Sequence, residues 1–202
     1  VYGVPFSATF DTEETTPLVI TESDNNTNKW FIGTAANNTT EVENGGALYV
    51  SADNGTTAGY NNSTSTDAYA SILLSFEEGA EFDISFDYKA GGETYTYDYL
   101  RAYLVPFGED INETEHALIA KKCSTNGWLT QTTTKPALRG IYSLVFYWYN
   151  DDMSGNSPAA IIDNISVTSR PCTGGIPVAI TFAENEEGNN IVVDIDDQFN
   201  SS

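Results

Sequence analysis

The stretch AIIDNISV, residues 160–167, alternates between its two faces in the manner of a β-strand. Alternate side chains of an extended chain share a face, here Ile161, Asp163, Ile165 and Val167. Three of these residues form cores readily, whereas a carboxylate is costly to bury unless it is paired, hydrogen-bonded or bound to a cation. We therefore expect a buried strand in which Asp163 has a special role.

Short alternating segments of this kind recur along the chain, separated by clusters of Gly, Asn, Asp and Thr. Almost no stretch has the apolar spacing of an amphipathic helix. This pattern is typical of a β-sandwich or barrel, so we expect an all-β protein. The expected strands are 6–10, 29–33, 47–51, 68–76, 81–89, 96–105, 140–149 and 160–167, and residues 116–120 fit either a helical turn or a strand.

The pattern breaks at SRPCTGGIP, residues 169–177, where Pro and Gly interrupt regular structure. Residues 1–170 have a length that suits one sandwich domain. Residues 178–199 resemble two strands joined by a turn, and two strands alone are marginally stable in water. We expect 171–202 to be a linker and a hairpin that either extends the main domain or begins a following module.

The charge of the chain limits the classes of partner that it can bind. The 202 residues include 29 acidic and 8 basic side chains, which gives a formal net charge of −21. Phosphate binding needs a basic surface, so we expect no nucleic-acid partner. No apolar run approaches the ~20 residues of a membrane helix, so we expect no membrane insertion.

Few residues could support catalysis. The only histidine, His116, lies in an acidic loop, where we expect it to be solvated. No serine stands in a glycine-flanked elbow, and no Cys/His cluster has zinc spacing. A glycoside hydrolase with two carboxylates is an alternative. However, the acids cluster in loops such as 11–14 and 107–115 instead of on strand faces, so we expect a non-catalytic protein.

Calcium fits the acidic residues better, because Ca²⁺ binds carboxylate, amide and carbonyl oxygens. Asp24 begins a D-x-N-x-N spacing that supplies such oxygens. If the first and last strands are neighbours, Asp11 would meet Asp163 at one edge, and a cation there would join the two ends of the domain. The alternative is that Asp163 accepts hydrogen bonds from loop amides without any metal.

The segment TYDYLRAYLV, residues 96–105, places its leucines on one face and Tyr97, Tyr99 and Tyr103 on the other. If the leucine side is the core, an exposed aromatic stripe is left. Such stripes bind sugar rings or partner surfaces, so these tyrosines are candidate ligand-binding residues. The alternative is that both faces are buried.

The two cysteines, Cys123 and Cys172, both lie in polar segments. Exposed thiols are reactive, so we expect a disulfide between the two residues, which would indicate an oxidising compartment. Buried thiols are the alternative.

Several segments, taken in order, resemble the jelly-roll domains of Bacteroidetes surface proteins of the cleaved-adhesin and choice-of-anchor group, which are similar in layout to the MAM domain. They are Phe10-Asp11, SDNNTNKW (23–30), GGALYVS (45–51), FDISFDYKAGGE (82–93), YDYLRAYLVP (97–106), GIYSLVFYWYND (140–151) and SPAAIIDNISV (157–167), followed by a linker with Pro and Cys.

The resemblance implies a jelly-roll β-sandwich of the galactose-binding or MAM-like type, secreted or displayed on the cell surface. It implies an adhesion or carbohydrate-binding module whose partners are a glycan or a host or cell-surface protein, together with other modules of the same chain. It also implies structural Ca²⁺ at Asp11, Asp163 and, less directly, Asp24, although Asn replaces the acids and glycines usual in that loop. A glycoside hydrolase and a purely structural spacer are the alternatives.

Overall fold

The computed structural model describes residues 1–34, 45–77, 80–171, 181–184 and 191–194. The chain divides into two compact units, Val1–Arg170 and Pro171–Ser202. The described part of the first unit consists of two six-stranded sheets, and its one helical element is the 3-10 turn η1 (Glu13–Thr15). The expected all-β jelly-roll sandwich is therefore confirmed.

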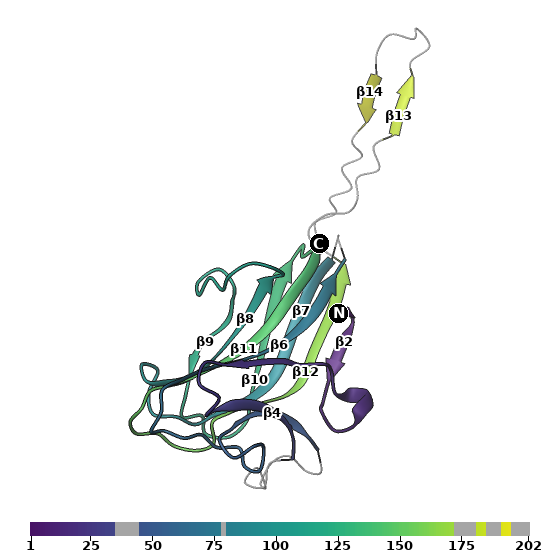
Figure 1. Ribbon diagram of the computed structural model, residues 1–202. Helices are drawn as coiled ribbons and strands as arrows, with labels where there is room; N and C mark the ends of the chain where they lie inside the picture. Colours follow the sequence, from purple (N-terminus) through teal and green to yellow (C-terminus); the bar gives the residue numbers. More distant parts are fainter. Residues whose placement is uncertain (35–44, 78–79, 172–180, 185–190, 195–202) are drawn as a thin grey trace. The chain divides into compact units, whose positions relative to one another are not determined.

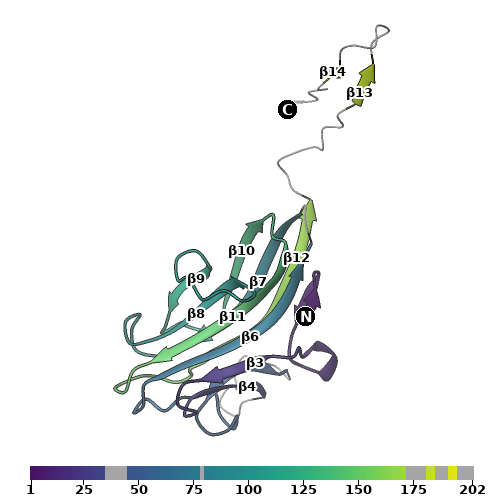
Figure 2. The same cartoon turned by 45° about the horizontal axis from the view of Figure 1, so that its top comes forward.

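The first sheet has the strand order β1-β6-β11-β8-β9, and β3 also pairs with β6. These strands are β1 (Tyr2–Gly3), β3 (Ile20–Ser23), β6 (Thr66–Phe76), β8 (Asp98–Pro106), β9 (Ala117–Lys122) and β11 (Gly140–Asn150). The long strands β6, β11 and β8 lie side by side and antiparallel at the centre of this sheet (Figure 2).

The second sheet has the order β10-β7-β12-β5-β4. The strand β2 also pairs with β12 and lies beside it (Figure 1). Its strands are β2 (Phe6–Ala8), β4 (Lys29–Gly33), β5 (Ala47–Ser51), β7 (Ala80–Ala90), β10 (Leu129–Pro136) and β12 (Ala160–Pro171). Because β2 pairs with β12, the start and the end of the first unit are neighbours in one sheet.

One apolar core fills the space between the two sheets. Every second residue of β6 is buried along its whole length, as the alternating sequence predicts. Trp148, Phe146 and Phe86 are 0% exposed in this core, and each buried side chain of this size contributes about 1.5–3 kcal/mol. The indole nitrogen of Trp30 donates to the carbonyl oxygen of Ala68 at 3.1 Å, which connects the sheets.

Three described strands of the first unit were not expected from the sequence: the two-residue strand β1, β3 and β10. The edge strand β10, LTQTTTKP, pairs only with β7 and leaves alternate threonines exposed, so it has no apolar alternation to recognise. The edge strand β3 lies between the expected strands 6–10 and 29–33, and it pairs with β6. Residues 116–120, which were ambiguous, belong largely to strand β9.

The predicted faces of β12 were wrong in one respect. Ile161 lies opposite Tyr49 in a small cluster on the outer face of the second sheet, whereas Ile165 lies in the main core. The backbone of Asn164 is left-handed, with φ of 50°, so the alternation changes phase at a bulge. Asp163 stands at this bulge, on the outer side, and is 9% exposed.

In the second unit, β13 (Thr181–Glu184) and β14 (Ile191–Asp194) pair antiparallel, with Thr181 opposite Asp194. Among the residues that the structure describes, no helix is long and apolar enough to cross a membrane.

Replacing Asn164 by Val is expected to lower the free energy of unfolding by about 1–2 kcal/mol, because a β-branched side chain is strained in the left-handed region. The control is Asn164→Gly, which also loses the Nδ2 hydrogen bond to Asp87 but tolerates positive φ. Urea denaturation compares the two variants. If both variants lose the same free energy of unfolding, the loss comes from the missing side-chain hydrogen bond and not from strain at positive φ.

Candidate functional site

The outer face of the first sheet carries a cluster of tyrosines, here called the tyrosine cluster: Tyr69, Tyr99, Tyr103, Tyr147 and Tyr149. The strand register places Tyr69 and Tyr147 side by side on β6 and β11. Their rings stack, with centroids 4.7 Å apart and an interplanar angle of 17°. Burial and a hydrogen bond to Asp67 raise the pKa of Tyr147. Its hydroxyl therefore stays protonated and donates a hydrogen bond to the carboxylate of Asp67.

The predicted stripe of exposed tyrosines is wrong for Tyr99 and Tyr103, where the alternative of a second buried face holds. The leucines of β8 lie in the core as expected, but Tyr99 and Tyr103 are only 7% and 1% exposed. The Lys121 amine lies 3.9 Å from the centroid of the Tyr99 ring, and the Arg101 guanidinium lies 4.9 Å from that of Tyr103. Basic side chains therefore pack on these rings.

Tyr97 is 46% exposed and lies in the turn before β8 instead of on the strand. Of the three tyrosines singled out from the sequence, it is the one whose ring is accessible. Its role in ligand binding stays a prediction.

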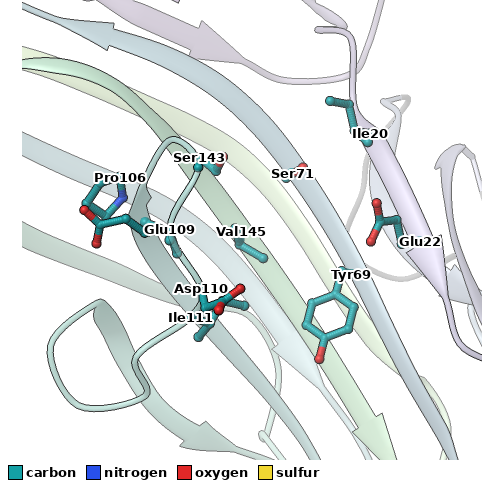
Figure 3. Close-up of a pocket in the computed structure, with 12 residues that line it drawn as sticks. Ile20, Glu22, Tyr69, Ser71, Pro106, Glu109, Asp110, Ile111, Ser143 and Val145 are labelled. Carbon is teal, nitrogen blue, oxygen red and sulfur yellow. The ribbon is translucent and has the colours of Figure 1, made fainter.

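Beside the tyrosine cluster, the same face is hollowed into a cleft of about 410 Å³. Its floor consists of side chains from three adjacent strands: Tyr69, Ser71, Val105, Ser143 and Val145. Figure 3 shows Ile20 and Glu22 on one side of this floor and the segment 106–111 on the other. The cleft thus combines hydroxyl groups, apolar side chains and carboxylates.

The first wall of the cleft is formed by the register of β3. Ile20 lies opposite Ser71, and Glu22 lies opposite Tyr69. Directly opposed residues of two strands point to the same face, so both β3 side chains project on the cleft side of the sheet. Ile20 is 46% exposed there.

The second wall, residues 106–111, leads into the loop 107–116, which the buried Arg101 holds in place. Its Nη1 lies 2.5 Å from a carboxylate oxygen of Glu113, and its Nη2 donates to the carbonyl oxygen of the same residue at 2.7 Å. His116 was expected to be solvated, but it is only 7% exposed. Its Nδ1 accepts the backbone N–H of Asn112 at 3.0 Å, so the histidine also orders this loop.

Two of the three predicted calcium ligands lie near each other. Asp163 accepts the backbone N–H of Asn164 at 2.7 Å, and Asp11 accepts that of Gly46 at 3.0 Å. Burial, with smaller contributions from the charges of Asp11 and Asp87, raises the pKa of Asp163 to about 6. Within the described residues, no basic side chain is among the groups that shift the pKa of this carboxylate.

Asp24 does not join this pair. Its carboxylate accepts the backbone N–H of Asp67 on β6, in the other sheet, at 3.2 Å. Across the described ranges, no group of three or more acidic, histidine or cysteine side chains is placed to hold a metal ion. A cation at Asp11 and Asp163 would therefore need amide, backbone or water oxygens as well, and calcium stays a prediction.

Cys123, which follows β9, is only 8% exposed. It is therefore buried, although its polar sequence segment predicted an exposed position. Burial raises the pKa of its thiol. Cys172 lies outside the described residues, and the disulfide between the two stays a prediction.

No known protein-family model matches the chain, and neither does any curated protein sequence. Among solved structures, the chain is similar to the K1 cleaved adhesin domain of the Lys-gingipain of Porphyromonas gingivalis, with a TM-score of 0.55 and 15% identity, over 83% of this chain and 99% of that one. It is also similar to the module TmCBM61 in complex with β-1,4-galactotriose, with a TM-score of 0.50 and 10% identity, over 75% and 88%. At these identities the likeness establishes the shared sandwich fold alone.

We expect the metal-free protein to lose stability as pH rises from about 4 to about 6. Asp163 binds its proton more tightly in the native state than in the unfolded chain, so ionisation favours unfolding. In EDTA at about pH 7.5, Asp163→Asn should be about 2 kcal/mol more stable than the wild type, with little difference near pH 4. Urea denaturation across this range measures the effect, with the exposed-acid variant Asp152→Asn as control. A pH-independent difference would contradict this account.

Proposed function

We propose that this chain is a non-catalytic glycan-binding or adhesion module of an extracellular or cell-surface protein, and that it binds its ligand in the cleft of the first sheet. The observation that carries the proposal is the cleft of about 410 Å³ across β3, β6, β8, β11 and the segment 106–111. Ligand sites commonly have volumes of about 300–1,000 Å³, so the cleft has room for sugar residues.

The lining of the cleft suits the two kinds of surface that a sugar ring presents. Ser71 and Ser143 offer hydroxyls that donate and accept hydrogen bonds, and the carboxylates accept bonds from sugar hydroxyls. Val105 and Val145 offer apolar contact to the C–H faces of a ring. The sandwich fold shared with an adhesin domain and a carbohydrate-binding module is compatible with this function, but it does not determine it.

The main alternative is a glycoside hydrolase, since Glu22, Glu109 and Asp110 all line the cleft. Hydrolysis requires two carboxyl groups about 5–9.5 Å apart, one of them held protonated by an apolar environment. All three residues are exposed, which provides no such environment. A reducing-sugar assay on any glycan that binds tests this alternative directly.

Filling the cleft should abolish binding without unfolding the protein. Ser143→Tyr places a ring on the floor of the cleft, between Val105 and Leu73 of the neighbouring strands. We expect affinity for a glycan identified on an array to fall at least about tenfold. The matched control is Ser85→Tyr, on the outer face of the second sheet opposite Thr132, which should bind normally.

Circular dichroism and the midpoint of thermal unfolding check that both variants are folded. Unchanged binding by Ser143→Tyr would place the glycan elsewhere, for example at Tyr97. An array on which the wild type binds nothing would favour the structural spacer.

We also propose that Ca²⁺ at Asp11 and Asp163 stabilises the sandwich by neutralising two acids where its first and last strands pair. Thermal unfolding with about 1 mM Ca²⁺ should then show a higher midpoint than unfolding in EDTA. A ligand at 100 times its dissociation constant adds about 2.7 kcal/mol, which corresponds to several degrees in a domain of this size. Asp163→Ala should not respond to Ca²⁺. A wild type that also ignores Ca²⁺ would rule out the metal.

A further inference from the structure

We propose that the cleft selects glycans that carry free amino groups over neutral glycans, and that it excludes glycans with carboxylate or sulfate groups. This inference rests on the proposed function and names the class of ligand for the same site. Two observations support it: the carboxylates that line the cleft, and the contacts that direct nearby basic side chains away from those carboxylates.

Carboxylates stand on both walls of the cleft. Glu22 projects from β3 on one side, and Glu109 and Asp110 project from the loop on the other (Figure 3). The described residues that line the cleft include no lysine or arginine. A ligand between the walls therefore experiences negative potential from two directions, and low-dielectric walls focus such a field.

Two basic residues on this face, Arg101 and Lys121, are directed elsewhere, whereas the Nε2 of the buried His116 lies 3.8 Å from a carboxylate oxygen of Glu109. Arg101 binds Glu113 through both terminal nitrogens and packs over the ring of Tyr103. Lys121 packs over the ring of Tyr99. These contacts belong to the tyrosine cluster and to the loop, so neither side chain neutralises the carboxylates of the cleft.

The acidic loop has a defined structure. Arg101 holds it at Glu113, and the Asn112 side chain accepts the backbone N–H groups of Thr114 and Glu115 at 3.1 and 3.2 Å. His116 accepts the N–H of Asn112. Because the loop is ordered at these points, Glu109 and Asp110 need not be repositioned extensively when a ligand binds, and their charges favour a cation at little entropic cost.

A glycan is favoured over a basic peptide by the floor of the cleft. Ser71, Ser143 and the Tyr69 ring lie between the walls, and hydroxyl and aromatic groups suit a polyhydroxylated ring better than a flexible lysine stem. The expected ligand is therefore an oligosaccharide of 2-amino-2-deoxy sugars, whose protonated amines face the two walls.

The test is a glycan array, followed by calorimetry, that compares matched chains in free-amino, neutral and uronate forms at about pH 6. Surface ion pairs are individually weak, so three carboxylates together should favour the amino form about tenfold over the neutral form at low salt. In ~1 M NaCl the Debye length falls to about 3 Å, and the preference should disappear. The uronate form should not bind.

The double variant Glu109→Gln/Asp110→Asn should reduce the preference at least about threefold. The control Glu14→Gln/Asp152→Asn removes the same number of exposed acidic charges outside the lining of the cleft and should leave the preference unchanged.

If the neutral chain binds as tightly as the amino chain, this inference is wrong while the proposed function stands. If no glycan binds, the proposed function is wrong as well. If a lysine tetrapeptide binds as tightly as the amino tetrasaccharide, the cleft selects charge alone and the glycan inference is overturned.

Discussion

The two-residue repeat of three long strands is the constraint on which the rest of this structure depends. In β6, β11 and β8, one set of alternate side chains fills the core, and the other set forms the outer face of the first sheet. A shift by one residue would exchange the two sets, so the core fixes the register of the candidate site. Ser71 and Ser143 lie in the cleft because Ile72 and Leu144 are buried.

The second sheet departs from this repeat where its acid would otherwise face the core. The bulge at Asn164 moves Ile165 into the core and leaves Asp163 on the outer side, beside the strand that leads to Asp11. The backbone bulge thus explains in part how an apolar strand accommodates a carboxylate. The raised pKa of Asp163 remains, and it is the physical reason to look for a cation there.

The candidate site is assembled from parts that are far apart in the sequence. Its walls come from residues 20–22 and 106–111, and its floor comes from β6, β8 and β11. Sequence reasoning singled out the tyrosines of β8, whose rings are mostly covered, and missed the serines of β6 and β11. Ser71 and Ser143 carried no local signal, because a polar residue on the outer face of a strand is ordinary.

The sequence by itself determined the all-β class, most of the strands and the acidic character, because alternation and charge are local properties of the chain. It did not reveal β10, since an edge strand of exposed threonines buries little, nor the bulge that reverses the faces of β12. Only the tertiary structure decided which part of the outer face of the first sheet is covered and which part is open. Arg101 and Lys121 pack on Tyr103 and Tyr99, whereas β3 and the acidic loop leave a cleft beside them. Such coverage depends on contacts between distant segments, which no local pattern encodes.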